Sequence, residues 1–171
     1  MSDYTLRVLN SSSQREMDTI ITFSMMTLWE SRPELRIDPA RVPDFGFAST
    51  AQLYRAGVQN PHQRYLIALD DDANIVGHSI IGLRTSEGNE RYGYFWSRYV
   101  LPNHRKKGLA GRFMTEALDW FREKGVTRAE VHVHHSNTPL RKLFEKNDFT
   151  IIDRRTNRWE YVVMSRDLSG S

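Results

Sequence analysis

Hydrophobic positions change their spacing along the chain and divide its first part into extended and helical stretches. Apolar residues alternate at residues 5–9 and then recur three and four positions apart from residue 17 to residue 28, which predicts a strand followed by a helix. Ser13 is the expected N-cap of that helix, with Glu16 as its capping-box partner, and Pro33 should end it. Prolines interrupt residues 31–47, which predicts an ordered loop, and a short helix is expected at residues 51–58.

The second part of the chain is dominated by runs rich in β-branched and aromatic residues. Two hairpin strands are expected at residues 65–69 and 75–83, a central strand at 92–100, and a helix at 108–124 with Gly125 at its end. They are followed by a strand at 129–134, a helix at 138–146 and two closing strands at 150–153 and 159–164. This order predicts an α/β (α+β) fold with a mixed, mostly antiparallel central sheet of six to seven strands, flanked by about four helices.

Composition narrows the class of protein. A chain of 171 residues fits one domain, so residues 1–171 are expected to form a single domain. The absence of cysteine excludes disulfides, thiolate metal sites and cysteine nucleophiles. The first residues lack the features of a signal peptide, and no apolar run approaches a membrane span, so we expect a cytoplasmic protein without membrane contact. The formal net charge of +3 neither requires nor excludes an anionic partner.

The most informative stretch is residues 99–111, YVLPNHRKKGLAG, in which an expected strand passes through a basic, glycine-containing turn into an expected helix. Backbone N–H groups in such a turn, together with the positive end of the helix dipole, favour a phosphate or pyrophosphate. The stretch is neither a Walker loop nor the GxGxxG dinucleotide turn. The alternative is that Gly108 simply eases a turn and that the basic side chains form a solvated face.

Two motifs resemble those of the GNAT acetyltransferases. Arg105-x-x-Gly108-x-Ala110, preceded by Val100 and Pro102, resembles the pyrophosphate-binding signature [QR]xxGx[GA] of that superfamily. Residues 132–149, HVHHSNTPLRKLFEKNDF, resemble its strand, Asn and helix pattern that ends in LYEKxGF. With the matching order of elements, the resemblance covers nearly the whole chain.

The resemblance implies an acetyl-CoA-dependent N-acetyltransferase with no metal. Coenzyme A would lie between two splayed strands of the sheet, with its pyrophosphate at residues 105–110. Asn137 would lie beside the pantetheine arm, or would act as the N-cap of the following helix, or both. The residues expected to bind the cofactor are Tyr99, Val100, Arg105, Lys106, Lys107, Gly108, Leu109, Ala110, Gly111, Asn137 and Phe144.

The chain departs from the family at its catalytic positions. An amine must lose its proton before it attacks a thioester, so a base is needed. One usual glutamate position holds Tyr94, a poor base, and another holds His132, which is our first candidate. His134 shares the face of His132 and is the second candidate, although this strand end could instead be merely polar. These histidines, with His135, lack a carboxylate or cysteine at a recognisable spacing, so a metal site is not expected.

Two further family positions differ. Phe144 stands where the family often has a tyrosine that protonates the departing thiolate, and this loss should slow catalysis without abolishing it, because a thiolate leaves without obligatory protonation. Asp148 replaces the usual glycine, which is tolerable because aspartate adopts left-handed backbone conformations more readily than most residues.

The expected acceptor is a primary amine of a small molecule or peptide. The resemblance places the acceptor site at residues 25–54 and at the last hairpin, with Trp29 and Glu30 as substrate-binding residues, whereas arginines at residues 154–158 would favour an acidic substrate. The main alternative is a noncatalytic acyl-CoA-binding regulatory module. Nucleic-acid binding is less favoured, because no aromatic platform accompanies the basic residues. Family members commonly self-associate, so a homodimer is a further prediction.

Overall fold

The computed structural model describes residues 3–32, 47–157 and 159–170. Most of the loop expected at residues 31–47 lies outside them. The chain forms two compact units, the first made of Met1–Ile81 with Ser97–Met114 and the second of Gly82–Trp96 with Thr115–Ser171.

The described elements confirm the predicted fold class. The helices are α1 (Gln14–Ser31), α3 (Phe47–Gly57), α4 (Leu109–Glu123) and α5 (Thr138–Lys146), with a 3₁₀ turn at Pro102–His104. The strands are β1 (Thr5–Val8), β2 (Gln63–Leu69), β3 (Ile75–Thr85), β4 (Arg91–Val100), β5 (Arg128–His134), β6 (Thr150–Thr156) and β7 (Glu160–Asp167). They form one seven-stranded sheet in the order β1-β2-β3-β4-β5-β7-β6. The sheet is mixed, since β4 and β5 pair in parallel whereas β5 with β7 and β6 with β7 pair antiparallel.

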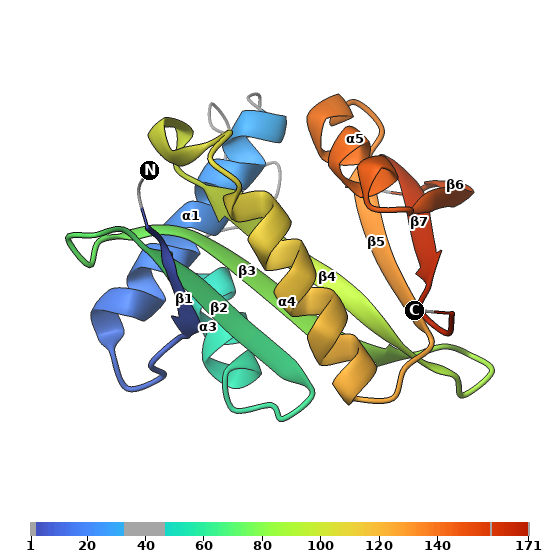
Figure 1. Cartoon of the computed structure of the whole chain (residues 1–171), viewed down its shortest axis with the longest axis horizontal. Coiled ribbons are helices and arrows are strands. Elements are labelled where there is room, and N and C mark those ends of the chain that lie inside the picture. The colour runs from blue at the N-terminus through green and yellow to red at the C-terminus, as the bar shows by residue number, and fades with distance from the viewer. Residues whose placement is uncertain (1–2, 33–46, 158, 171) are drawn as a thin grey trace. The chain divides into compact units, whose positions relative to one another are not determined.

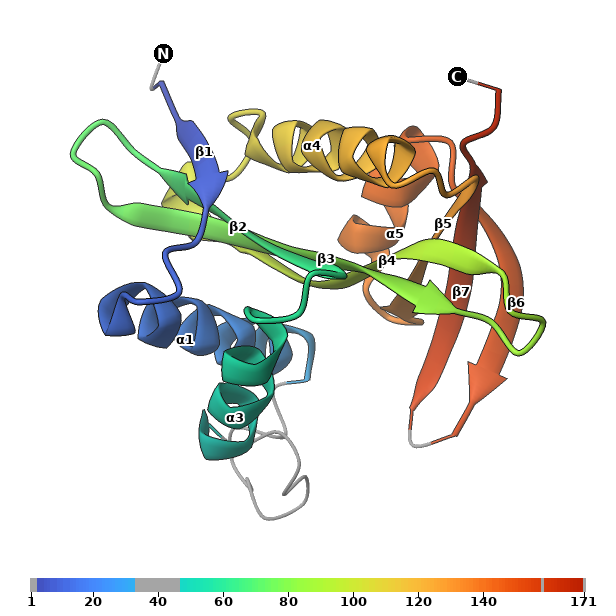
Figure 2. The same cartoon turned by 90° about the horizontal axis from the view of Figure 1, so that it is seen from below.

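In the first unit, helices cover both faces of the strands. Figure 2 shows α1 and α3 on one face of β1 to β3 and the start of α4 on the other. The alternation of strand β2 explains this arrangement, because Tyr65 and Ile67 belong to the core cluster of α1 and α3, whereas Leu66 and Ala68 pack with the first turns of α4. The end of β4 and the turn into α4 adjoin this core, since Val100 and Leu101 also pack against it.

The second unit is organised around aromatic side chains. Strands β5, β7 and β6 lie beside helix α5 (Figure 1). Phe95 of β4 makes edge contacts with Phe121, Phe144 and Phe149. Gly93 allows this packing, because a Cβ atom there would lie 2.6 Å from the Phe121 ring. Val131 and Val133 of β5 are buried, so the alternating His132 and His134 lie on the other face of that strand.

The observed helix starts differ from the predictions in detail. Ser13 caps α1 as expected, since its hydroxyl accepts the Glu16 N–H at 3.2 Å. The capping box is wrong, however, because the Glu16 carboxylate accepts the backbone N–H of Asn10 and pairs with Arg7. Helix α3 begins at Phe47, four residues before the expected start at residue 51.

The closing strands are longer than predicted. Strand β6 continues to Thr156 and β7 continues to Asp167, because backbone pairing with neighbouring strands continues through polar residues that side-chain periodicity does not mark as strand. Gly125 (φ 73°), expected to end a helix, and Asp148 (φ 64°), which replaces the usual glycine, both adopt left-handed conformations. None of the helices in the described part of the chain is long and apolar enough to cross a membrane.

Candidate active site

The turn between β4 and α4, residues 105–111, has the geometry of an anion cradle, and we use that name for it. Lys106 (φ 58°) and Gly108 (φ 86°) both adopt left-handed conformations, which turn the backbone sharply. The N–H groups of Lys106, Lys107 and Gly108 make no hydrogen bond within residues 3–32, 47–157 and 159–170. Helix α4 begins at Leu109, so its first N–H groups have no intrahelical acceptor.

Side chains hold the cradle in place and leave its backbone exposed. Leu109 is 1% exposed and packs in the first unit's core, whereas the four preceding residues are exposed. Arg105, Lys106 and Lys107 carry positive charges in the same turn, and the positive end of the α4 dipole adds to their field. Exposed N–H groups and positive charge together favour an anion at the cradle.

Arg105, the first residue of the cradle, is bound to the end of α1. Its Nη2 lies 2.9 Å from Oε2 of Glu30, and its Nε donates to the carbonyl of Val100 at 2.8 Å. The Tyr99 hydroxyl donates to Oε1 of Glu30 at 2.8 Å. Burial and the nearby Glu30 carboxylate raise the pKa of the Tyr99 hydroxyl to about 12.

This contact joins two groups of predicted residues within the first unit. Trp29 and Glu30, expected to bind substrate, lie exposed on the last turn of α1. Tyr99, Val100 and Arg105, expected to bind cofactor, lie at the end of β4 and in the cradle. The Glu30 carboxylate, expected to bind substrate, pairs here with Arg105.

His132 on β5 lies in a compact polar cluster of the second unit. Its Nε2 is 3.0 Å from Oε1 of Glu130. The imidazole stacks on the Tyr161 ring, with centroids 5.0 Å apart, and meets the Tyr94 ring edge-on at 5.2 Å. The side chain is 23% exposed, so it is accessible from solvent.

The other two predicted bases have less suitable surroundings. Tyr94 is 8% exposed, and burial raises the pKa of its phenol to about 12, which leaves it protonated at neutral pH. The Nδ1 atom of His134 lies 2.7 Å from the Ser136 hydroxyl and accepts the Ser136 backbone N–H at 3.3 Å. These contacts tie His134 to the turn that precedes α5.

Two residues predicted to bind the cofactor have structural roles. The Asn137 side chain accepts the Leu140 N–H at 3.3 Å, so it caps α5. Phe144 is 1% exposed and packs on Phe95 and Phe149 in the core. Its ring therefore offers almost no surface to a ligand, contrary to the prediction that it contacts the cofactor.

Sequence reasoning missed the partner of His132. Arg128, Glu130 and His132 occupy alternate positions of β5, and this period of two places them on one face. That spacing was the available signal for Glu130. The sequence patterns also gave no signal for His78, which is fully buried and whose Nε2 lies 2.9 Å from Ser97 Oγ. Burial lowers the pKa of His78 to about 3, so its imidazole stays neutral and cannot contact a substrate.

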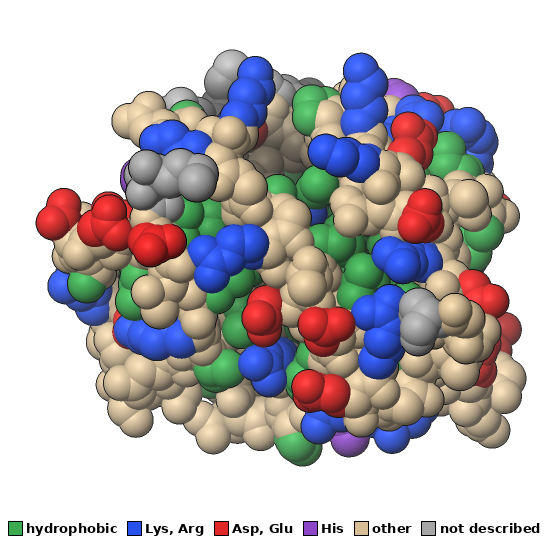
Figure 3. Space-filling model, viewed as in Figure 1, with side chains coloured by type: hydrophobic (Ala, Val, Ile, Leu, Met, Phe, Trp, Pro, Cys, Tyr) green, Lys and Arg blue, Asp and Glu red, His purple; other side chains and the backbone are tan. Residues whose placement is uncertain are grey.

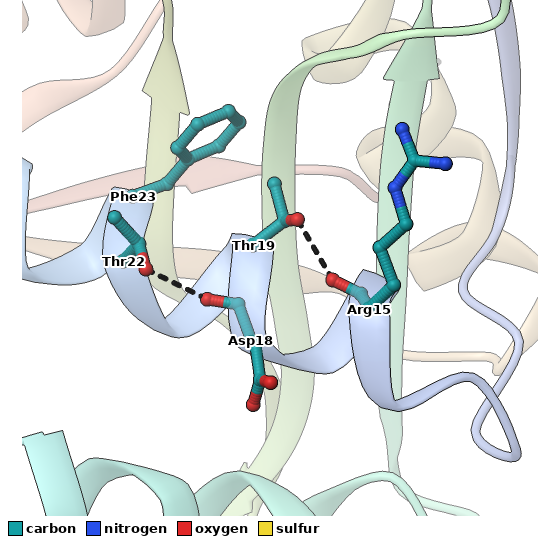
Figure 4. A pocket seen from close by; sticks show the side chains of 5 residues that line it. All are labelled: Arg15, Asp18, Thr19, Thr22 and Phe23. Carbon is teal, nitrogen blue, oxygen red and sulfur yellow. Dashed lines mark hydrogen bonds between the residues drawn. The ribbon is translucent and has the colours of Figure 1, made fainter.

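Other surfaces of the described residues offer less chemistry. An open groove of about 470 Å³ runs along α1 and is lined by Arg15, Asp18, Thr19, Thr22 and Phe23 (Figure 4). Both threonine hydroxyls there donate to backbone carbonyls of their own helix. Positive and negative side chains are interspersed on the face drawn in Figure 3, unlike a continuous nucleic-acid-binding surface. Within the described ranges, no group of three His, Asp or Glu residues could hold a metal ion.

Comparisons with known proteins agree with this geometry. GCN5-related N-acetyltransferase 6, chloroplastic, of Arabidopsis thaliana is 34% identical over 67 residues, which are 39% of this chain and 23% of that protein. Among solved structures, the PaiA N-acetyltransferase of Thermoplasma acidophilum in complex with coenzyme A has a TM-score of 0.73 and 16% identity, covering 96% of this chain and 99% of that one. Spermidine N-acetyltransferase of Vibrio cholerae, with CoA and spermine, has a TM-score of 0.68 and 19% identity, covering 97% and 96%.

The family model gives the most specific match. Residues 25–149 match the model of the acetyltransferase (GNAT) family, and this range includes the cradle, His132 and the segment through Phe149. The similarity of the solved structures, all below 25% identity, independently supports the fold. The chain therefore belongs to the acetyltransferase (GNAT) family.

Proposed function

We propose that this protein transfers the acetyl group of acetyl-CoA to a primary amine of a small molecule or peptide. The observation that carries this proposal is the cradle, in which Lys106 and Gly108 expose successive N–H groups at the start of α4. Amine acceptors are consistent with the structural relative that was solved with spermine. The identity of the amine is left to a substrate screen.

The cradle would hold the pyrophosphate through backbone N–H groups and through the side chains of Arg105, Lys106 and Lys107. Arg105 presents two N–H edges, of which one faces Val100 and the other faces Glu30. Because the pair with Glu30 is exposed, Arg105 can exchange the carboxylate for a phosphate at little cost. Tyr99 and Val100 would contact the pantetheine arm through their backbone.

His132 is the base in this proposal. Acetyl-CoA supplies the acetyl group as a thioester, whose C–S bond breaks as the amine nitrogen forms the new C–N bond. The Nδ1 atom of His132 takes the proton that the amine loses, and the sulfur leaves as a thiolate. Tyr94 is too weak a base, and His134 is engaged with Ser136.

Residues 1–171 would act as one acetyltransferase domain. The chain passes from one compact unit to the other inside β3, at the boundary between Ile81 and Gly82, and again inside β4 and α4. Neither unit is a continuous segment, so neither can be removed without cutting three elements.

The cradle is tested by Gly108→Val with Gly125→Val as its matched control. Both glycines have positive φ, and a Cβ atom at either one would meet no atom within 4 Å, so both variants carry similar backbone strain. We expect Gly108→Val to weaken acetyl-CoA binding by at least about tenfold in calorimetry and Gly125→Val to leave it near the wild-type value. Equal affinities in the two variants would contradict the cradle.

Catalysis is tested by the release of CoA thiol from acetyl-CoA in the presence of a panel of primary amines. We expect amine-dependent release that falls about 100-fold or more in His132→Ala. His135→Ala removes a neighbouring exposed imidazole and should have little effect. Binding of acetyl-CoA without release for any amine would instead favour a regulatory module.

A further inference from the structure

Glu130 is a carboxylate that neither the family motifs nor the proposed base assignment includes. It lies two residues before His132 on β5, and its side chain is 10% exposed. One oxygen, Oε1, lies 3.0 Å from Nε2 of His132. A carboxylate this far from solvent requires charged or hydrogen-bonding partners, and His132 is one of them.

The second oxygen of Glu130 is held by Arg128. The Nη1 atom of Arg128 donates to Oε2 of Glu130. The Arg128 guanidinium also lies 4.2 Å from the Tyr92 ring centroid and pairs with Glu90 at 3.4 Å. The hydrogen bond from His132 is the largest cause of the lowered pKa of Glu130, and Arg128 lowers it further. Glu130 is therefore ionised at neutral pH and can only accept hydrogen bonds.

The imidazole of His132 is fixed from the neighbouring strands as well. The titratable and charged groups that face it are Glu130 on β5, Tyr94 on β4 and Tyr161 on β7. Arg84 on β3 lies 4.5 Å from the Tyr94 ring centroid. Glu130 is thus the one described anion that the imidazole contacts directly.

We propose that Glu130 is the positioning residue of the catalytic base, a role that rests on the proposed function of His132. An ionised carboxylate requires a donor, so neutral His132 carries its proton on Nε2 and presents the Nδ1 lone pair. When Nδ1 accepts the proton of the amine, the Glu130 charge stabilises the resulting imidazolium. Arg128 keeps the carboxylate from taking that proton itself. Within the described residues, Nδ1 of His132 has no hydrogen-bond partner.

The test is Glu130→Gln, which keeps the shape of the side chain and removes its charge. We expect kcat to fall about tenfold with KM nearly unchanged, because the Glu130 charge stabilises the imidazolium only as the proton is transferred. In a His132→Ala background the same substitution should cause no further loss. Glu160→Gln is the matched control, because Glu160 pairs with His135 at 3.6 Å in an exposed position.

A second variant and a second measurement separate positioning from folding. Glu130→Asp retains the charge, so it should recover part of the kcat that Glu130→Gln loses, and thermal unfolding checks that both variants fold. Under alkaline conditions, the ring-nitrogen NMR shifts of His132 should report a proton on Nε2 in the wild type and a mixture of the two neutral tautomers in Glu130→Gln.

An unchanged kcat and unchanged ring-nitrogen shifts in Glu130→Gln would overturn the role of Glu130 while leaving the proposed function intact. A wild-type protein that shows no amine-dependent thiol release would overturn the proposed function, and the catalytic role of Glu130 with it. In that case the ring-nitrogen shifts would still report whether the Glu130 carboxylate fixes the His132 proton on Nε2.

Discussion

The two arginine–glutamate pairs that matter most differ in how freely they can change partners. Arg105 and Glu30, in the first unit, have side chains that are 41% and 47% exposed. Arg128 and Glu130, in the second unit, are 25% and 10% exposed. An exposed pair adds little stability and is readily exchanged, whereas a pair withdrawn from water is costly to break. The first pair thus suits a ligand-binding arginine, and the second suits a fixed catalytic support.

The largest difference should appear in stability. Arg128→Ala leaves the Glu130 carboxylate without its arginine partner, and we expect the free energy of unfolding to fall by about 2 kcal/mol. Arg105→Ala should lower it by less than about 1 kcal/mol. Urea denaturation of both variants measures the difference. Equal losses would show that the two pairs do not differ in the way that their exposure indicates.

A smaller difference should appear in cofactor affinity. Arg105→Ala removes a charged donor from the cradle, so acetyl-CoA should bind about tenfold more weakly. Glu30→Gln removes the carboxylate that competes for Arg105, so acetyl-CoA should bind about two- to threefold more tightly. Calorimetry checks both values at one fixed salt concentration. Weaker binding in Glu30→Gln would mean that Glu30 supports the cofactor and does not compete with it.

The smallest effect should be the acid sensitivity that Glu130 adds. The partners of Glu130 hold its pKa below the ordinary value of 4.5. Its contribution to stability is therefore complete above that value and is lost as the pH falls through the lower, folded-state pKa. The stability of Glu130→Gln should consequently depend less on pH below about 4.5 than that of the wild type. Denaturation curves at several acidic pH values measure how the free energy of unfolding changes with pH in each protein. The same pH dependence in the variant and the wild type would contradict this interpretation.

The sequence predicted the fold because each element carries its own local signal. Short stretches of sequence are enough to show the helical spacing before Pro33, the alternation of the strands and the residue types at Gly125 and Asp148. The closing hairpin was underestimated because its outer residues are polar and are stabilised by backbone pairing across the turn. Local patterns do not report such pairing.

The site was predictable to a lesser extent. The cradle follows from a contiguous motif, and the Glu130–His132 pair could have been found from the strand period of two. The Glu30–Arg105 contact joins residues 75 positions apart and has no local signature. The burial of Phe144 could not be predicted, because a family motif locates a residue along the chain and does not show how its side chain packs.

The central claim is that the cradle holds the pyrophosphate of acetyl-CoA, and a calorimetric comparison of acetyl-CoA with S-acetylpantetheine tests it most directly. The smaller thioester carries the same acetyl and pantetheine groups and lacks the pyrophosphate and nucleotide. We predict that the wild-type protein binds acetyl-CoA at least about tenfold more tightly, and that Gly108→Val removes most of this advantage. Equal affinities for the two thioesters in the wild type would contradict the account.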